Sequence, residues 1–267
     1  MKKRVKTKKR TECYSGYYER GKVSVLMLTY SYTKHLFDAI ECFLSQTYDN
    51  KELILLDSGS TTHYEYVSER LRRMGKRAEG IRHVYVSNSD FNTVGDLRNF
   101  AIRLCSGEYV CIYDDDDLMS NNRIERQLKF LKENGDGYCV LGSYSVSSDS
   151  SGNLNFIGND QDGLLGTIMF KNDIRIGRVI LFGESNCNEY DEFIKKLEFI
   201  GYERALMITA NKDFFIMQTT SLNLQKGDFF DKIIKKISNS ILQNEKTKKN
   251  LKKLLSDCEN NLSLHCE

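Results

Sequence analysis

The sequence contains no proline and no tryptophan, and only four of its 267 residues are histidine. Eight cysteines are present, but none of them forms a CxxC pair, which argues against a zinc site. No apolar run approaches the ~20 residues that a transmembrane helix needs, and no apolar stretch follows the basic start, as a signal peptide would require. Scattered cysteines suit a reducing compartment, so we expect a cytoplasmic protein.

The chain contains 39 basic and 37 acidic residues, so neither sign of charge dominates. The net charge of +2 gives no general affinity for polyanions, but basic residues gather at both ends. Residues 1–20 are predicted to be a basic, solvated tail, and residues 226–267 a basic amphipathic helical tail. Such a helix could lie on an anionic membrane surface, or pack on the rest of the chain or on a second subunit.

Strands and helices are predicted to alternate along residues 23–134. Short apolar runs indicate buried strands, and each of the first three is followed by a predicted helix. These runs are 23–29, 52–57, 81–86 and 109–113. The alternation is typical of an α/β fold with a doubly wound, mostly parallel sheet. Further on, the pattern predicts strands at 138–146, 164–170 and 205–209 and a helix near 193–200.

Four consecutive aspartates, Asp114 to Asp117, follow the apolar run 109–113 directly. A strand that ends in this way places its carboxylates at the edge where open α/β sheets bind ligands. Adjacent carboxylates raise one another's pKa unless a cation neutralises them, and oxygen ligands suit Mg²⁺ or Mn²⁺. The run therefore predicts a metal site that serves phosphate groups; the alternative is an acidic turn exposed to solvent.

Short motifs along residues 23–141 carry a resemblance to a known family. They are Thr29-Tyr30-Ser31, Phe43-Leu44-Ser45-Gln46-Thr47-Tyr48, Asp57-Ser58-Gly59-Ser60-Thr61, Arg98-Asn99, Ser106-Gly107-Glu108-Tyr109-Val110 before the aspartates, and Arg123-Ile124-Glu125-Arg126-Gln127. In this order they resemble the nucleotide-binding half of family 2 glycosyltransferases, which have the GT-A fold. The resemblance implies a catalytic domain over residues 21–225, with a nucleotide-sugar-binding half at 21–135 and an acceptor half at 136–225.

The resemblance also implies a nucleotide-sugar donor whose diphosphate is held by Mn²⁺ or Mg²⁺. Asp116 would be the direct metal ligand, and Asp114 would complete the DXD spacing. Asp114 and Asp115 would contact the metal through water or hold the ribose, and Asp117 could do either. A cation held in this way would act as a Lewis acid on the departing diphosphate.

The base and the diphosphate have further candidate partners by the same resemblance. Thr29, Tyr30 and Asp57 would line the base pocket, and Arg98 would face the diphosphate or else pack against its own sheet. The family usually has two carboxylates at the end of the second strand, and the second one reads the base. Ser58 stands there in this chain, so uracil would meet a hydroxyl without charge assistance, and Asp57 would have to supply the recognition.

The acceptor half should contain the base that deprotonates the acceptor hydroxyl in an inverting transfer. The family has an acidic residue just before a helix at this place. Aligning residues 188–191 with the family motif puts Glu189 at the base position, whereas another register leaves Asp191 as the nearest acid. Alternatively, these acids only favour the start of a helix, in which case the enzyme would be weak or inactive.

The sequence therefore predicts a metal-dependent, inverting glycosyltransferase. It would move a sugar from a nucleotide-diphosphate donor, with UDP expected as the nucleotide, to a hydroxyl of a glycan, a lipid-linked sugar or another acceptor. The basic tails would suit peripheral contact with the inner face of a membrane. The alternatives are a GT-A-fold binding module with weak or no catalysis, and a nucleic-acid-associated protein that uses its basic tails.

Overall fold

The computed structural model describes residues 18–31, 36–119, 121–135, 137–148, 154–172, 182, 189–199, 201–208 and 215–218. Its helices are α1 (Leu36–Leu44), α2 (Thr61–Met74), α3 (Val94–Ile102), α4 (Arg123–Glu133) and α5 (Glu189–Phe199), with 3₁₀ turns η1 (Gly75–Ala78) and η2 (Asn88–Asp90). Its strands are β1 (Glu19–Thr29), β2 (Lys51–Asp57), β3 (Ile81–Tyr85), β4 (Gly107–Asp114), β5 (Asp117–Leu118), β6 (Tyr138–Ser148), β7 (Leu154–Lys171), β8 (Arg204–Ile208) and β9 (Phe215–Gln218). The predicted C-terminal helical tail and most of the predicted N-terminal tail lie outside the described residues.

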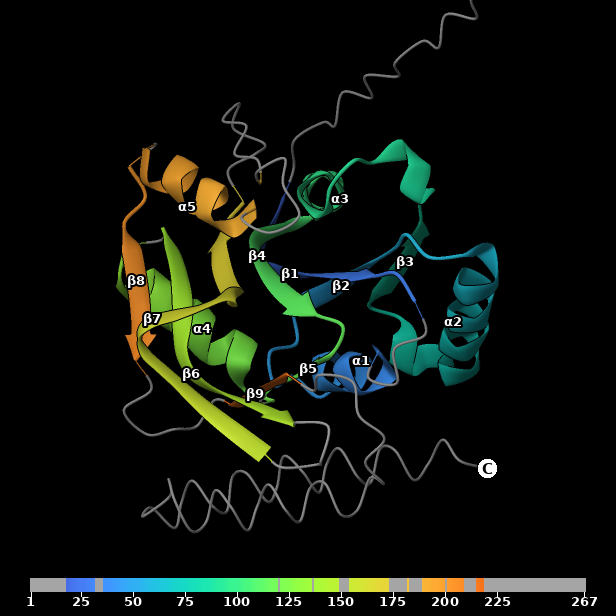
Figure 1. Ribbon diagram of the computed structural model, residues 1–267, viewed down its shortest axis with the longest axis horizontal. Helices are drawn as coiled ribbons and strands as arrows, with labels where there is room; N and C mark the ends of the chain where they lie inside the picture. The colour runs from blue at the N-terminus through green and yellow to red at the C-terminus, as the bar shows by residue number, and fades with distance from the viewer. Residues whose placement is uncertain are drawn as a thin grey trace, which may run out of the picture.

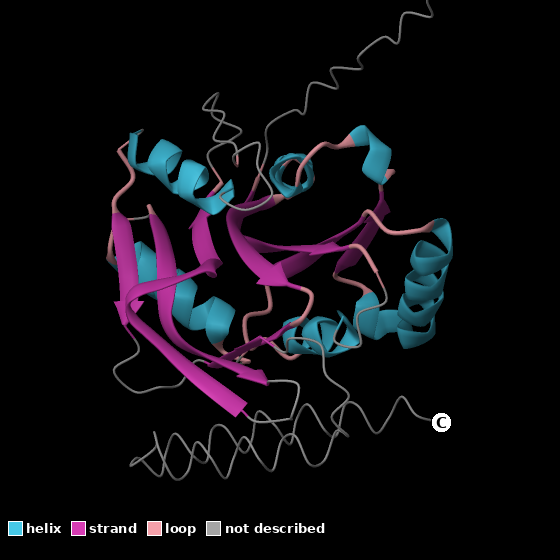
Figure 2. Ribbon diagram, viewed as in Figure 1, coloured by secondary structure: helices cyan, strands magenta, loops and turns pink. Residues whose placement is uncertain are grey.

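The described strands form one sheet, in the order β3-β2-β1-β4-β7-β6-β9-β5, with β8 paired to β6 (Figure 2). The first four strands in this order are parallel, so β1, β2 and β4 end at the same edge of the sheet. Thr29 pairs with Asp57, and Leu28 pairs with Asp114. This register brings the ends of three predicted strands together at one edge. The doubly wound, mostly parallel arrangement is confirmed for the first half of the chain.

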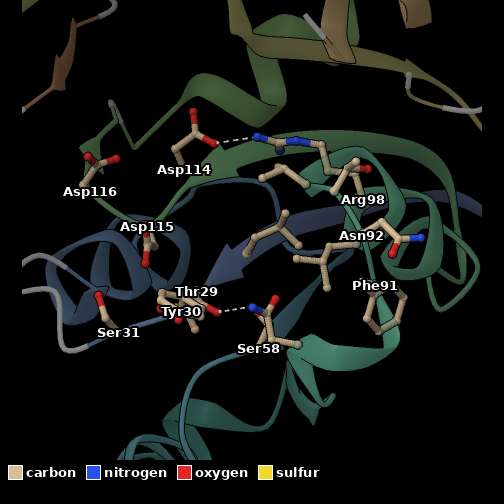
Figure 3. Close-up of a pocket in the computed structure, with 15 residues that line it drawn as sticks. Thr29, Tyr30, Ser31, Ser58, Phe91, Asn92, Arg98, Asp114, Asp115 and Asp116 are labelled. Carbon is tan, nitrogen blue, oxygen red and sulfur yellow. Dashed lines mark hydrogen bonds and ion pairs between the residues drawn. The ribbon is translucent and has the colours of Figure 1, made fainter. Parts of the chain in front are cut away.

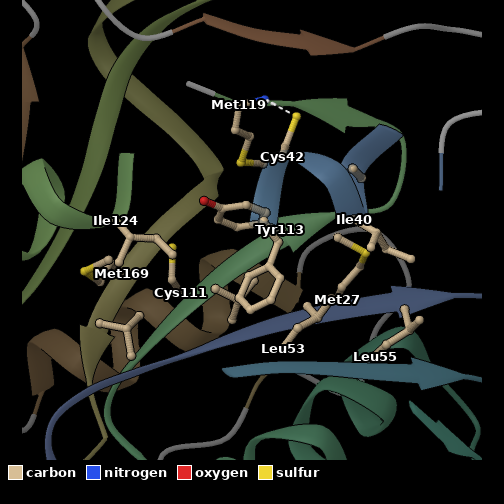
Figure 4. Close-up of a cluster of buried hydrophobic side chains, with 14 of the residues drawn as sticks. Met27, Ile40, Cys42, Leu53, Leu55, Cys111, Tyr113, Met119, Ile124 and Met169 are labelled. Carbon is tan, nitrogen blue, oxygen red and sulfur yellow. Dashed lines mark hydrogen bonds between the residues drawn. The ribbon is translucent and has the colours of Figure 1, made fainter. Parts of the chain in front are cut away.

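Helices cover both faces of the sheet (Figure 1). One apolar cluster packs α1, α2 and α4 against the face that carries Val25 and Met27 of β1 (Figure 4). A second cluster packs α3 and α5 against the face that carries Leu26 and Ile54. Both faces of the central strands are therefore buried, which explains why these strands appear in the sequence as continuous apolar runs.

Two helices begin at strand ends because polar side chains cap them. Ser60 accepts a hydrogen bond from the backbone N–H of His63 at the start of α2. Thr93 and Asp96 form a reciprocal capping box at the start of α3, which satisfies backbone donors that have no partner within the helix. These caps fix the positions of the loops that precede α2 and α3.

The second half of the chain differs in detail from the expected pattern. Strand β7 begins at Leu154 and is longer than the predicted strand 164–170, and β5 and β9 were not predicted. The pair β5 and β9 is antiparallel and joins residues about a hundred positions apart, so local periodicity carries no signal for it. Within the described residues, no helix combines the length and the apolar character needed to cross a membrane.

Candidate functional site

A pocket of about 700 Å³ opens at the edge where β1, β2 and β4 end (Figure 3). Its volume lies within the range of roughly 300–1,000 Å³ that is common for small-molecule sites. The lining residues are Leu28, Thr29, Tyr30, Ser31, Ser58, Asn88, Phe91, Asn92, Thr93, Val94, Leu97, Arg98, Asp114, Asp115 and Asp116. The N-terminus of α3 is part of this wall, and helix N-termini favour anionic ligands.

Three aspartates of the acidic run form one end of the pocket. Asp114, Asp115 and Asp116 come from the end of β4 and the turn after it. Burial raises the pKa of Asp115 to about 6, and the negative charges of Asp116 and Asp114 add to the effect. The three carboxylates therefore create a site at which a bound cation would be favourable.

Asp117 is separated from its three neighbours, because it is 1% exposed and does not line the pocket. Burial, and then the charges of Asp114 and Asp116, raise its pKa to about 9, although the positive charge of Arg123 opposes this. Arg123 is itself buried beneath the acidic run and donates to the carbonyl oxygens of Ile112 and Thr167, both at 2.9 Å. Arg123 thus ties the end of β4 to β7 and to α4.

The acidic end fits a divalent cation only together with further oxygen ligands. Among the residues that the structure describes, no group of three or more His, Cys, Asp and Glu side chains could hold a metal ion by itself. Mg²⁺ is commonly bound by one or two carboxylates together with substrate phosphates and water. Asp114 and Asp116 could therefore hold a cation jointly with a diphosphate.

Asp57 does not line the pocket, although it ends β2 beside it. Its side chain is 0% exposed, and it accepts hydrogen bonds from Gly59 N at 2.9 Å, His63 Nδ1 at 3.1 Å and His83 Nε2 at 3.2 Å. Burial raises the pKa of Asp57, but the hydrogen bonds from His83, Gly59 and His63 outweigh this and leave the pKa below its usual value. The carboxylate therefore fixes the loop after β2 from behind the pocket.

Two histidines share the Asp57 carboxylate, an arrangement that the sequence did not reveal. These histidines come from α2 and β3, and His83 Nδ1 contacts Ser68 Oγ at 3.0 Å. The four histidines are widely spaced in the sequence, at positions 35, 63, 83 and 265, so nothing in it indicates that two of them share a partner. Packing is the role the structure supports for His63 and His83, but they share one carboxylate, which no sequence spacing indicated.

The other end of the pocket is built from neutral polar groups and aromatic rings. Ser58 N donates to the carbonyl oxygen of Thr29 at 3.0 Å, and Ser58 Oγ lies 3.5 Å from the same oxygen (Figure 3). The loop is tight, because a Cβ at Gly59 would collide with the Tyr30 carbonyl oxygen. Tyr30 itself is 61% exposed, so its ring is available to a ligand at the rim.

Arg98 stands between the pocket and the second half of the chain. It lies on α3, is 6% exposed, and its Nη2 atom is 3.4 Å from Asp114 Oδ1 (Figure 3). Its guanidinium carbon lies 4.7 Å from the ring centroid of Tyr190 and 5.7 Å from that of Phe182. Arg98 therefore lines the pocket and is also packed against aromatic rings inside the protein, and its predicted contact with a diphosphate stays a prediction.

Asn99 has a structural role. Asn99 Nδ2 donates to the Phe182 carbonyl oxygen at 3.2 Å, and Phe182 N donates to Asn99 Oδ1 at 2.6 Å. This paired contact is buried and joins residues 83 positions apart. It holds Phe182 against α3.

The two candidate bases both belong to α5. Glu189 is the first residue of this helix, and Asp191 is exposed on it. Asp191 does not line the pocket, and residues 183–188 lie outside the described residues. Of the predicted site residues, those that share one pocket are Thr29, Tyr30, Arg98, Asp114, Asp115 and Asp116. Asp57 does not line it, and the two candidate bases belong to α5.

Sequence reasoning missed the pocket wall formed by the segment before α3. Asn88, Phe91, Asn92 and Thr93 line the pocket and come from η2 and the turn that follows it. Polar residues and a turn after a predicted strand were the available signal, because ligand-binding residues concentrate on loops at the carboxyl ends of parallel strands.

Comparison with known proteins identifies the family. The model of glycosyl transferase family 2 matches residues 24–182, which is more than half of the chain. The chain belongs to glycosyltransferase family 2. The matched residues include those that line the pocket and extend to Phe182.

Known relatives include the glycosyltransferase GlyG of Streptococcus pneumoniae, which is 31% identical over 140 residues. That match covers 52% of this chain and 44% of GlyG. A glycosyltransferase of Rickettsia bellii is 36% identical over 114 residues, or 43% of this chain and 16% of the relative. The chain thus spans less than half the length of these family 2 relatives.

Solved structures show that the fold is the GT-A type found in other glycosyltransferases. TarS of Staphylococcus aureus, in a complex with UDP-GlcNAc, has a TM-score of 0.60 and 18% identity, over 92% of this chain and 76% of that one. The mannosyltransferase PcManGT of Pyrobaculum calidifontis, in complex with GDP-Man and Mn²⁺, has a TM-score of 0.55 and 14% identity, over 92% and 75%. The predicted fold is confirmed.

Proposed function

We propose that this family 2 glycosyltransferase transfers a sugar from a UDP-sugar to a hydroxyl group, with inversion and with the help of Mn²⁺ or Mg²⁺. The observation that carries the proposal is the single pocket in which Asp114, Asp115 and Asp116 meet the N-terminus of α3. One end of this pocket suits a cation with a diphosphate, and the other offers neutral polar groups and rings to a nucleoside. The TarS complex with UDP-GlcNAc supports UDP as the nucleotide.

The donor would lie across the pocket, with its phosphates at the acidic end. Asp114 and Asp116 would hold the cation, which when bound would stabilise the charge that develops on the departing diphosphate. Asp115 would hold the ribose, and Arg98, whose guanidinium is charged at all relevant pH values, would contribute positive charge on the α3 side. The PcManGT complex with GDP-Man and Mn²⁺ supports a role for a divalent cation.

The nucleoside would lie between Thr29, Tyr30 and Ser58. Its base would contact the Ser58 hydroxyl and neighbouring backbone groups, because the Asp57 carboxylate is already engaged by Gly59 and two histidines. Asp57 would contribute by holding the loop that presents Ser58. The exposed ring of Tyr30 would cover one face of the base.

The acceptor would approach from the side of α5. Glu189 at the first position of this helix would take the proton of the attacking hydroxyl as general base, with Asp191 as the other candidate. The acceptor would be a glycan or a lipid-linked sugar, and contact with a membrane surface through the basic tails would suit the latter.

Thermal unfolding with added nucleotides tests the donor site directly. A ligand that binds only the folded protein raises the melting temperature by mass action. We expect UDP with Mn²⁺ to stabilise the protein more than GDP, CDP or dTDP, and Asp116→Ala to abolish the effect of Mn²⁺. Glu65→Ala, which removes an exposed acid on α2, is the matched control and should respond like the wild type.

Turnover tests the acceptor side separately. Hydrolysis or transfer of a UDP-sugar should fall by about a hundredfold or more in Glu189→Gln, as general-base catalysis typically contributes that much, while UDP binding is retained. If no nucleotide stabilises the wild type, the donor-site assignment is wrong. If UDP binds and turnover is the same in Glu189→Gln, Asp191→Asn and the wild type, the assignment of the base is wrong. If UDP binds but no turnover occurs, the chain is a binding module with this fold.

A further inference from the structure

The donor pocket and the acceptor half are joined by two adjacent residues of α3. Asn99 binds the main chain of Phe182 in both directions. Arg98 reaches past it, placing its guanidinium beside the rings of Phe182 and Tyr190 on one side and Asp114 on the other. Tyr190 is the second residue of α5. Arg98 therefore packs against the helix that begins with the candidate base Glu189.

The rings that receive Arg98 are themselves held firmly. Phe182 stacks on Phe193 with a centroid distance of 4.1 Å and an angle of 7° between the planes. Tyr190 meets Phe182 edge-on at 5.6 Å and 82°, and Phe170 of β7 meets Phe193 at 4.9 Å. The aromatic platform of Phe170, Phe182, Tyr190 and Phe193 therefore packs α5 against the sheet and presents one face to Arg98.

We propose that Tyr190 is a positioning residue for the donor: its ring holds Arg98 in the orientation that receives the donor's diphosphate. The proposal rests on the proposed function, because it concerns the same donor site. It adds that this site is completed by the acceptor half, since Tyr190 lies on α5 while the other residues assigned to the donor come from the first half of the chain.

The physical reason lies in the geometry around the guanidinium. A cation over an aromatic face is attracted by the ring, so Tyr190 limits the directions in which Arg98 can point. The distance of 3.4 Å between Arg98 Nη2 and Asp114 Oδ1 is long for a charged hydrogen bond. Arg98 can therefore exchange this carboxylate for a phosphate oxygen without leaving the ring of Tyr190. Without the ring, Arg98 would lose its fixed orientation before the diphosphate arrives.

Tyr190→Leu tests the proposal because it removes the ring and keeps an apolar side chain. We expect it to weaken binding of UDP with Mn²⁺ on the order of tenfold, within the roughly two- to thirtyfold range of cation–π contacts. Binding of uridine, which has no phosphate, should remain unchanged. Tyr190→Phe keeps the ring and should bind UDP like the wild type.

Phe193→Leu is the matched control. It removes a ring from the same aromatic platform and the same helix, and this ring is not one of the two that lie beside Arg98. A purely structural role would make both leucine variants alike, with equal losses for UDP and uridine, and would overturn the proposal. Full UDP affinity in Tyr190→Leu would also overturn the proposal. A wild type that binds no UDP would instead refute the proposed function, so the two failures can be told apart by titration calorimetry on the full chain.

Discussion

Asp57→Asn is the substitution that most directly separates a structural carboxylate from one that reads the base. Asp57 accepts hydrogen bonds from Gly59 N, His63 and His83 in a fully buried position. Asparagine has nearly the same shape, but it has one acceptor oxygen, and its NH₂ group would face one of the partner nitrogens. At least one charge-assisted hydrogen bond is lost, and one buried group is left without a partner.

The expected loss is about 2.5–6 kcal/mol of unfolding free energy, because a hydrogen bond to a charged group contributes roughly 1.5–3 kcal/mol and an unpaired buried group costs about 1–3 kcal/mol. Urea unfolding at pH 7 measures this loss. Asp90→Asn, at an exposed position on η2, is the control and should unfold like the wild type.

The pH dependence has a definite sign. The net effect of burial and hydrogen bonding leaves the pKa of Asp57 below its ordinary value of 3.8. A group with a lowered folded-state pKa stabilises fully above its unfolded pKa and loses that contribution as pH falls through the folded pKa. The contribution of the Asp57 carboxylate to the difference between the wild type and Asp57→Asn should therefore be fully present well above pH 4 and shrink only below about pH 4.

Nucleotide binding supplies the result that would refute this reasoning. We expect Asp57→Asn to retain UDP binding with at most a modest loss, because the carboxylate faces the histidines and not the pocket. Normal stability together with abolished UDP binding would show that the carboxylate reads the base. The histidine cluster would then be incidental to the site.

Two further substitutions test the support beneath the acidic run. Arg123→Met should cost about 2–3 kcal/mol in urea unfolding, because it removes the charged donor to the carbonyl oxygens of Ile112 and Thr167, of which Thr167 keeps a hydrogen bond from Gln127. A loss below about 1 kcal/mol would contradict the assigned role. Gly166→Ala should weaken UDP–Mn²⁺ binding about tenfold with little loss of stability. The new Cβ would lie 2.9 Å from Asp114 Oδ2 and would displace that flexible carboxylate. Gly80→Ala, whose Cβ would have 3.7 Å of clearance, should bind UDP–Mn²⁺ normally, and equal affinities in the two variants would count against the contact.

Much of the first half of the chain could be predicted because its signals are local. The alternation of apolar runs with helical spacing indicated the doubly wound sheet, and parallel strands must end at a common edge. The placement of Asp114 near Thr29 and Ser58 follows from those two facts. The acidic run could also be recognised, because its four aspartates are adjacent in the sequence.

The separate environments of the acidic residues could not be predicted. Asp114 and Asp117 differ by three positions, yet one lines the pocket and the other is buried above Arg123. The turn after β4 decides this, because it directs successive side chains to different sides. Sequence reasoning could only treat the four carboxylates as one group.

By itself, then, the sequence determined the strands and helices of the first half, the edge where they end, and the family motifs placed there, since each depends on neighbouring residues. Only the tertiary structure decided that Asp57 belongs to His63 and His83, and that Arg98 rests on Tyr190. These partners are brought together by the packing of α2, α3 and α5 on the sheet. Contacts between residues so far apart in the chain depend on the whole fold, which local periodicity does not encode.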